Sequence, residues 1–311
     1  MAHRGGRGRR RGWTGYVLSF LLGALLALLG YAYYSHLAGD KPRPSKTLSK
    51  KAPPAARGVQ SQIPDSSSLT KEGDKPSSPQ ASPRPKIAIV IDDLGGENRI
   101  SRELLLFDVP VTLSILPFTT YSRVLATEAH LKGKEVILHL PMEPHGYPKV
   151  KPGKGALLEE MNEERLLQQL ARDIASVPNI KGVSNHMGSR LMEDPEKLKI
   201  IFSDLKQRGL FFLDSRTTPQ SAGLRTARSI GLKALERTLF IDHSSEEETI
   251  HEKLEHLIRS SLSTGMAIGI GHPHAATVQA IRERVPGMKE RGIEIVRLSA
   301  LIDESPNSKL R

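Results

Sequence analysis

Short apolar runs alternate with segments of helical periodicity over residues 86–311. Runs rich in β-branched residues predict strands, and apolar residues that recur every three to four positions predict helices. The predicted strands are KIAIVI, VTLSIL, EVILHL, GVSN, LFFL, TLFI, AIGIG and IEIVRL. The predicted helices include residues 162–177, 195–209 and 246–265. This alternation favours a parallel sheet, and seven or eight units suit a regular or slightly irregular barrel better than an open sheet.

Two of these helices begin with N-cap chemistry. Asp194 stands directly before Pro195, and Ser244 and Ser245 are followed by Glu247 and Glu248. Such residues satisfy the free N–H groups of a first helical turn.

The N-terminal part of the chain has a different pattern. Between Arg11 and Asp40 there is no charged residue, and aromatic residues lie at both ends of this run. A helix of about 20 apolar residues spans a bilayer, and aromatic residues favour its interfaces. A cleaved signal peptide is the alternative, but the run is too long and no A-x-A-like site follows it. We therefore expect residues 13–37 to form a transmembrane signal-anchor helix, with residues 1–12 in the cytoplasm because they carry five arginines.

Residues 38–85 are predicted to be a disordered linker. They contain nine proline and nine serine residues and no aromatic residue, so they cannot bury a core. As a coil this segment spans about 40 Å, and nearly 150 Å if it is stretched towards polyproline II. It would tether the folded domain to the anchor.

The net charge of +11 belongs to this N-terminal region. Residues 1–86 hold 15 Lys or Arg and 4 Asp or Glu, whereas the other 225 residues carry 30 of each sign. A nucleic-acid-binding domain would carry its basic residues on the folded surface, so this class is excluded. The chain contains no cysteine, which also excludes disulfides and cysteine-based zinc sites.

Six of the eight predicted strands end at an Asp or a His. These residues are Asp92 with Asp93, His139, His186, Asp214, Asp242 with His243, and His272 followed by His274. The carboxyl ends of the strands in a parallel barrel meet on one face, where active sites are built. The pattern predicts a polar site at that face, although a turn at Asp92-Asp93 or a core imidazole at His139 would also account for single members.

The residue types indicate metal-dependent chemistry. Asp93, His139 and His186 would supply one oxygen and two nitrogens to a divalent ion, most simply Zn²⁺, and leave positions open for water and substrate. Asp214 and His272 suit an acid/base pair, because a carboxylate orients a histidine and raises its proton affinity. His145 is a weaker candidate for the site, and His243 and His274 are left open.

Five strings in order, IAIVIDDLG, LHLPMEP, NHMGSR, LFFLDSRT and AIGIGHPH, resemble the divergent polysaccharide deacetylase family, a bacterial branch of the NodB-like carbohydrate deacetylases. The resemblance covers residues 86–300 and implies a distorted (β/α) barrel of about seven parallel strands with a divalent metal at its C-terminal rim. It implies Asp92 as the general base, Asp93 as a metal ligand and His272 as the catalytic acid. The usual His-x-x-x-His pair of the superfamily is absent; His139 occupies the corresponding strand, and His186 would supply the second imidazole.

These features lead to one expected function and two alternatives. We expect residues 86–303, followed by a tail at 304–311, to remove N-acetyl groups from an envelope polysaccharide or peptidoglycan-like substrate. The domain would lie in the periplasm, anchored to a bacterial inner membrane, with no organic cofactor. Substrate contacts are expected from Arg190, Arg216 and Glu143, although ion pairing is an equal explanation for the arginines. The alternatives are a non-catalytic glycan-binding or scaffold module, and an amidase or esterase with another substrate.

Overall fold

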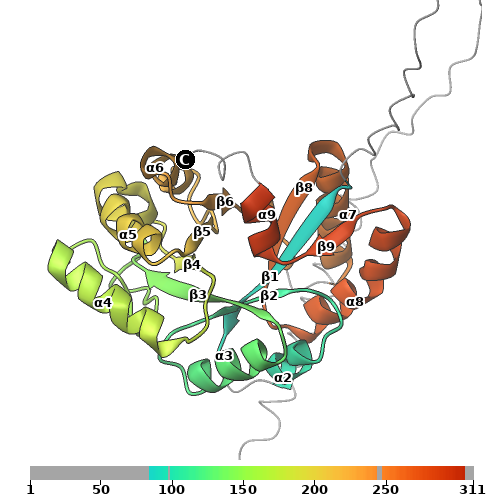
Figure 1. The fold of residues 1–311 in the computed structure, drawn as a ribbon, viewed down its shortest axis with the longest axis horizontal. Coiled ribbons are helices and arrows are strands. Elements are labelled where there is room, and N and C mark those ends of the chain that lie inside the picture. Colours follow the sequence, from blue (N-terminus) through green and yellow to red (C-terminus); the bar gives the residue numbers. More distant parts are fainter. Residues whose placement is uncertain (1–83, 97–98, 244–246, 305–311) are drawn as a thin grey trace, which may run out of the picture. The chain divides into compact units, whose positions relative to one another are not determined.

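One curled, parallel sheet organises the part of the chain that the computed structural model describes, residues 84–96, 99–243 and 247–304 (Figure 1). Its strands are β1 (Lys86–Leu94), β2 (Thr112–Ile115), β3 (Glu135–Met142), β4 (Gly182–Met187), β5 (Phe211–Asp214), β6 (Ala234–Glu236), β7 (Leu239–Phe240), β8 (Met266–Gly271) and β9 (Glu294–Val296). Their order across the sheet is β6-β5-β4-β3-β2-β1-β8-β7, and β9 pairs with the first residues of β1. All of these pairs are parallel, as the sequence predicts.

Helices cover the outer side of the curled sheet (Figure 1). They are α2 (Arg99–Leu105), α3 (Ser122–Leu131), α4 (Glu163–Ser176), α5 (Pro195–Gln207), α6 (Gly223–Ile230), α7 (Glu247–Thr264) and α8 (Ala275–Glu290), with a short 3-10 helix at Leu191–Glu193. The last helix, α9 (Leu298–Glu304), packs against the inner side instead. The three helices predicted from periodicity correspond to α4, α5 and α7 within one or two residues. Asp194 caps α5 as predicted, since its carboxylate accepts hydrogen bonds from the backbone N–H groups of Glu196 and Lys197.

A single extended segment joins the two ends of the sheet. Residues 234–236 pair with β5, and residues 239–240 pair with β8. Between them, Arg237 N–H donates to the carbonyl of Asp214, and Thr238 N–H donates to the carbonyl of Ile268. If β6 and β7 are counted as one interrupted strand, the ring has seven strands, and the fold fits a distorted (β/α) barrel. The sequence missed β6, because its three residues are too few to show a period of two.

The interior of the barrel has its own apolar core. Helix α9 closes this core at the N-terminal ends of the strands. Alternate residues of the strands point inwards, so that Ala88, Val90 and then Asp92 line the inside of β1. Leu298, Leu301 and Ile302 of α9 pack among the inward-facing apolar residues. The carboxylate of Glu135 accepts hydrogen bonds from the hydroxyl of Thr112 and from the N–H of Ser299, and so holds the first turn of α9. The polar site is therefore confined to the opposite, C-terminal end of the strands.

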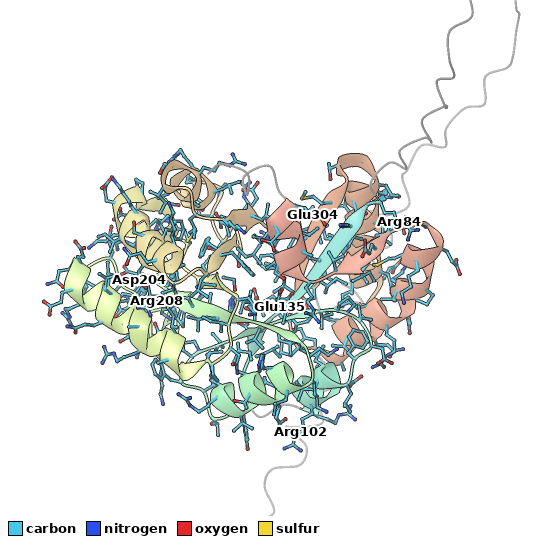
Figure 2. All side chains as sticks on the ribbon, viewed as in Figure 1. Arg84, Arg102, Glu135, Asp204, Arg208 and Glu304 are labelled. Atoms are coloured by element: carbon cyan, nitrogen blue, oxygen red, sulfur yellow. The ribbon has the colours of Figure 1, made fainter. Side chains whose placement is uncertain are left out.

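A second and larger apolar core lies between the sheet and the helices. Ile87, Ile89 and Ile91 of β1 belong to it and are fully buried. Polar side chains lie on the outer side of the helices, such as Asp204 of α5, which pairs with Arg208, the residue that follows this helix (Figure 2). Both faces of the sheet are thus covered, which explains why its strands are almost continuously apolar.

Several predictions concern residues outside the described part of the chain. They are the cytoplasmic segment 1–12, the membrane helix 13–37, residues 38–83 of the linker, the N-cap at Ser244 and Ser245, and residues 305–311 of the tail. None of the helices within residues 84–304 that the structure describes has the length and apolar character needed to span a bilayer.

Candidate metal centre and catalytic pocket

A pocket of about 320 Å³ opens at the C-terminal ends of the strands. Its lining contains five of the predicted site residues: Asp92, Asp93, His139, His186 and His272. They come from β1, β3 and β4 and from the residue that follows β8. The other lining residues are Pro144, Asn185, Met187, Ser189, Ser215, Thr217 and Phe240.

A β-bulge turns both carboxylates of the Asp-Asp pair towards this pocket. Between Ile91 and Leu94 the register of β1 with β2 shifts, with three steps along β1 against two along β2. Asp93 has a positive φ of 58°. Neighbouring residues of a regular strand point to opposite faces, and a bulge removes this constraint. The bulge and the strained backbone of Asp93 therefore explain why two adjacent aspartates line one site.

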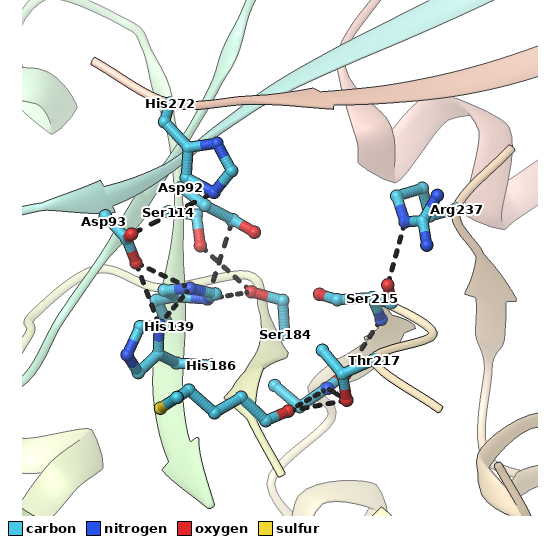
Figure 3. Close-up of polar contacts among 12 residues, drawn as sticks. Asp92, Asp93, Ser114, His139, Ser184, His186, Ser215, Thr217, Arg237 and His272 are labelled. Atoms are coloured by element: carbon cyan, nitrogen blue, oxygen red, sulfur yellow. Dashed lines mark hydrogen bonds and ion pairs between the residues drawn. The ribbon is translucent and has the colours of Figure 1, made fainter. Parts of the chain in front are cut away.

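Asp93, His139 and His186 form a close cluster (Figure 3). Asp93 Oδ1 lies 3.1 Å from His139 Nε2 and 2.9 Å from His186 Nδ1. The two ring nitrogens lie 3.1 Å from each other. Among the described residues this is the group of acidic and imidazole side chains whose ligand atoms converge closely enough to hold a metal ion. The structure thus brings together the three residues that the sequence predicts as ligands.

The two aspartates differ in their electrostatic environment. Burial raises the pKa of Asp92 above its ordinary value, against the opposing effects of His139 and Ser114. Burial also acts to raise the pKa of Asp93, but hydrogen bonds from His139 and His186 outweigh it and leave that pKa well below the ordinary value. The pair is thereby divided into a carboxylate that stays ionised, Asp93, and a carboxyl group with higher proton affinity, Asp92.

The carboxylate that orients His272 is Asp242, and the prediction of Asp214 for this role was wrong. Asp242 Oδ1 lies 2.8 Å from His272 Nδ1, and Asp242 Oδ2 accepts the backbone N–H of His272 at 2.6 Å. Burial acts to lower the pKa of His272, but Asp242 more than compensates and raises it. The reason lies in the sheet order: β7 pairs with β8, so the residues that follow these two strands become neighbours. Asp242 was visible in the sequence as a strand-end aspartate, but the sheet order was not.

Asp214 supports a loop instead. Its carboxylate accepts hydrogen bonds from the hydroxyl of Ser221 at 2.6 Å and from the backbone N–H of Arg216 at 2.7 Å. A Cβ on Gly223, the first residue of α6, would lie 2.4 Å from Asp214 Oδ2. Asp214 therefore fixes the turn between β5 and α6, and it is not among the residues that line the pocket.

The three predicted substrate-contacting residues pair with other charged side chains beside the pocket. Arg190 forms ion pairs with Glu143 and Glu159. Arg216 lies 3.2 Å from a carboxylate oxygen of Glu236. None of the three predicted residues is part of the pocket lining, so a contact with substrate remains a prediction.

The three further histidines lie outside the pocket lining. His145 is exposed and lies 3.2 Å from Glu193 Oε1. His243 is exposed, and His274 occupies the N-cap position of α8, where its ring lies 6.2 Å from that of His272.

Two residues behind His272 were not predicted. Phe240 stacks on His272 with ring centroids 5.8 Å apart, and the guanidinium of Arg237 lies 3.8 Å from the centroid of the Phe240 ring. Arg237 also donates hydrogen bonds to the carbonyls of Ser215 and Arg216. This stack fixes the side of the pocket where the barrel strand is interrupted. Ring stacking across strands leaves no spacing signal in a single sequence.

Ser215 provides a further polar group in the pocket wall. Its hydroxyl oxygen is buried and has no hydrogen-bond partner among the described residues. The backbone of Ser215 is held on both sides, since its N–H donates to Asn185 Oδ1 and its carbonyl accepts from Arg237.

Comparisons with known proteins assign a family to the region that holds the pocket. Residues 89–302 match the sequence profile described as divergent polysaccharide deacetylase. The uncharacterized protein YibQ of Escherichia coli is 32% identical over 219 residues, which are 70% of this chain and 68% of YibQ. An uncharacterized protein of Haemophilus influenzae is 30% identical over 211 residues, covering 66% of this chain and 72% of its own. The known structure of an uncharacterized protein from Agrobacterium tumefaciens C58 is similar with a TM-score of 0.68 at 30% identity, over 71% of this chain and 91% of that one.

Proposed function

We propose that this chain, which belongs to the divergent polysaccharide deacetylase family, is a metal-dependent hydrolase that removes N-acetyl groups from a polysaccharide of the cell envelope. The observation that carries the proposal is the pocket itself. It combines a cluster of possible metal ligands with Asp92 on one side and an Asp242-supported His272 on the other. These are the parts that amide hydrolysis requires.

The cluster of Asp93, His139 and His186 fits a divalent ion. Ligand atoms bound at about 2.1 Å to a tetrahedral ion lie about 3.4 Å apart, and the three atoms here are separated by 2.9–3.1 Å. One carboxylate oxygen and two imidazole nitrogens form a donor set that suits Zn²⁺, the ion we propose. When bound, such an ion supplies Lewis acidity to the amide carbonyl and to water.

Asp92 is the proposed general base. Its burial and raised pKa favour uptake of a proton, and its Oδ1 has no hydrogen-bond partner among the described residues. As the oxygen of water bonds to the carbonyl carbon of the N-acetyl group, a water proton passes to the Asp92 carboxylate.

His272 is the proposed acid. Asp242 holds its Nδ1, so Nε2 is directed to the pocket, where it lies 4.0 Å from Asp93 Oδ2. When the C–N bond breaks, the proton on His272 Nε2 passes to the leaving nitrogen, and the products are acetate and the free amine.

The proposed substrate is a polysaccharide or a peptidoglycan-like glycan outside the cytoplasm. The family description supports the chemical class, and the apolar run at residues 13–37 with the linker at 38–85 supports export with an inner-membrane anchor. The access of the pocket supports catalysis over a scaffold role, because the side chains of Asp93 and His186 are 36% and 23% exposed at its mouth. No residue of the loop at 145–155 lines the pocket, although Pro144, which directly precedes the loop, does.

Acetate release tests this proposal. The zinc-loaded, full-length chain should release acetate from N-acetylglucosamine oligomers or from peptidoglycan, and Asp92→Asn should lower the rate by about 10²–10⁴-fold. Asp173→Asn, which changes a buried carboxyl group of α4, is the matched control and should retain the rate. Absence of acetate from every glycan, with metal bound, would contradict the proposal and favour the glycan-binding module. Hydrolysis of peptides or simple esters without action on glycans would favour the amidase or esterase alternative.

A further inference from the structure

Strand β4 loses its partner on one side just before His186. Its backbone pairs with β5 only as far as Ser184, which lies opposite Leu213, whereas its pairing with β3 continues to Met187. Buried backbone groups that leave a sheet need other hydrogen-bond partners. On the side of β5, the backbone around His186 has no strand partner among the described residues.

Two polar side chains replace the backbone pairing where it stops. Asn185 Oδ1 accepts the backbone N–H of Ser215, the residue that follows β5, at 2.8 Å. Asn185 Nδ2 donates to the carbonyl of Met187 at 2.9 Å. The hydroxyl of Thr217 donates to the same carbonyl at 2.7 Å (Figure 3). The end of β4 is thus joined to the segment after β5 by side chains that line the pocket.

These contacts enclose the backbone of His186. The side chain of Asn185 reaches past His186 to the carbonyl of Met187, so this hydrogen bond closes a small ring that contains the His186 backbone. Met187 has a φ of 53°, and a non-glycine residue keeps such a conformation only where its surroundings constrain it. The two hydrogen bonds to its carbonyl supply this constraint. Asn185 is 1% exposed, so water does not compete for its partners.

The orientation of the His186 ring depends on this backbone. The Nδ1 of His186 contacts Asp93 and His139, but its Nε2 has no partner among the described residues. The ring of His139, in contrast, is also held from behind by the hydroxyl of Ser184. The His186 side chain is 23% exposed and that of His139 only 3%. His186 is therefore the imidazole of the cluster that needs support through its main chain.

We propose that Asn185 and Thr217 are positioning residues that hold the backbone of His186, so that its imidazole is presented to a divalent metal together with Asp93 and His139. This inference rests on the proposed function for the identity of the occupant of the cluster, but the orientation of His186 is a property of the metal-free chain. Residues that orient a metal ligand without touching the metal typically contribute about 10- to 100-fold to metal affinity.

The experiment uses the full-length chain with Asn185→Ala and with Thr217→Val, which removes the hydroxyl at nearly constant volume. Thr218→Val is the matched control, because it makes the same change at the next residue. The hydroxyl of Thr218 donates to Glu193, and this residue does not line the pocket. Three-bond NMR couplings of the metal-free protein report whether the His186 side chain keeps one rotamer. Competition with a chromophoric chelator reports the affinity for Zn²⁺.

We expect one rotamer of His186 and the same Zn²⁺ affinity in the wild type and in Thr218→Val. Thr217→Val and Asn185→Ala should each populate further rotamers and weaken Zn²⁺ binding by about 10- to 100-fold. Thr217→Ser, which keeps the hydroxyl, should retain the wild-type rotamer and affinity. If Asn185→Ala does not fold, Thr217→Val decides the question.

Two results would overturn the inference. One is an unchanged rotamer or an unchanged Zn²⁺ affinity in the folded Thr217→Val variant. The other is an equal loss in Thr218→Val, because a hydroxyl that does not contact β4 would then matter as much. A wild-type chain that binds no zinc would contradict the proposed function instead, and the rotamers of His186 in the metal-free chains would still decide whether these residues position it.

Discussion

Asp242 holds His272 through both of its carboxylate oxygens, one on Nδ1 and one on the backbone N–H. The second oxygen also accepts the hydroxyl of Thr277, so the carboxylate has little freedom to turn. At the scale of single residues, the orientation of His272 therefore depends on a carboxylate that is itself fixed by its partners.

Asp242→Asn should lower the pKa of His272, because a neutral amide no longer stabilises the imidazolium. The alkaline limit of activity should move to lower pH, and the rate should fall by about 10²-fold. Histidine NMR titration measures the pKa directly. Asp214→Asn is the control, since it changes another buried strand-end aspartate that does not touch His272, and an equal shift in that variant would contradict the assignment.

A buried carboxyl group away from the pocket allows a prediction on stability. Burial raises the pKa of Asp173 on α4 to about 8, and one of its oxygens has no hydrogen-bond partner among the described residues. The folded chain therefore retains a proton that the unfolded chain loses above about pH 4. It follows that Asp173 lowers the free energy of unfolding as the pH rises from about 4 to 8.

Asp173→Asn should remove this dependence. At pH 8 the free energy of unfolding should exceed that of the wild type by about 1–3 kcal/mol, and at pH 4.5 the two proteins should differ little. Urea unfolding at both pH values checks this. A difference that does not change with pH would show that Asp173 is ionised in the folded protein.

Among the structural elements, strand β1 shows how the backbone prepares the site. The bulge at Asp92-Asp93 is followed by Gly95, which has a φ of +118° and whose carbonyl accepts hydrogen bonds from Thr119 and Tyr121. A Cβ on Gly95 would lie 2.4 Å from the hydroxyl oxygen of Thr119. The chain after the bulge is thus shaped by glycine.

Gly95→Ala should lower the free energy of unfolding by about 1–3 kcal/mol, because the added methyl group meets both an unfavourable φ and a close neighbour. Gly96→Ala is a matched control at the next residue. Gly96 does not have a positive φ, and a Cβ there would have no atom within 4 Å. Chemical denaturation of the two variants checks the difference, and equal stabilities would show that the bulge is not constrained by Gly95.

Eight of the nine described strands could be predicted as short apolar runs, because both faces of the sheet are covered. Helices α4, α5 and α7 could be predicted from their periodicity, because each buries one side. The predicted cluster of Asp93, His139 and His186 required only that strand ends converge, which every parallel barrel ensures. Asp242 was assigned no role, because the partner of His272 depends on which strands are neighbours. The bulge and the stack of Arg237 on Phe240 depend on three-dimensional packing and leave no spacing signal.

At the scale of the whole molecule, one end of the barrel is apolar and the other is polar. Helix α9 fills the end of the barrel where the strands begin with Leu298, Leu301 and Ile302. The pocket occupies the end where the strands finish. The family expected from the five sequence motifs is confirmed over residues 89–302. The membrane anchor and the periplasmic location remain predictions from the sequence of residues 1–85.

The most direct test of the account is the metal content of the purified full-length chain, measured by elemental analysis after loading with zinc. We predict about one divalent ion per chain for the wild type and for His145→Ala, whose side chain lies outside the pocket lining, and a large loss in His186→Ala. A wild-type chain that binds no zinc, cobalt or nickel would contradict the metal-dependent mechanism.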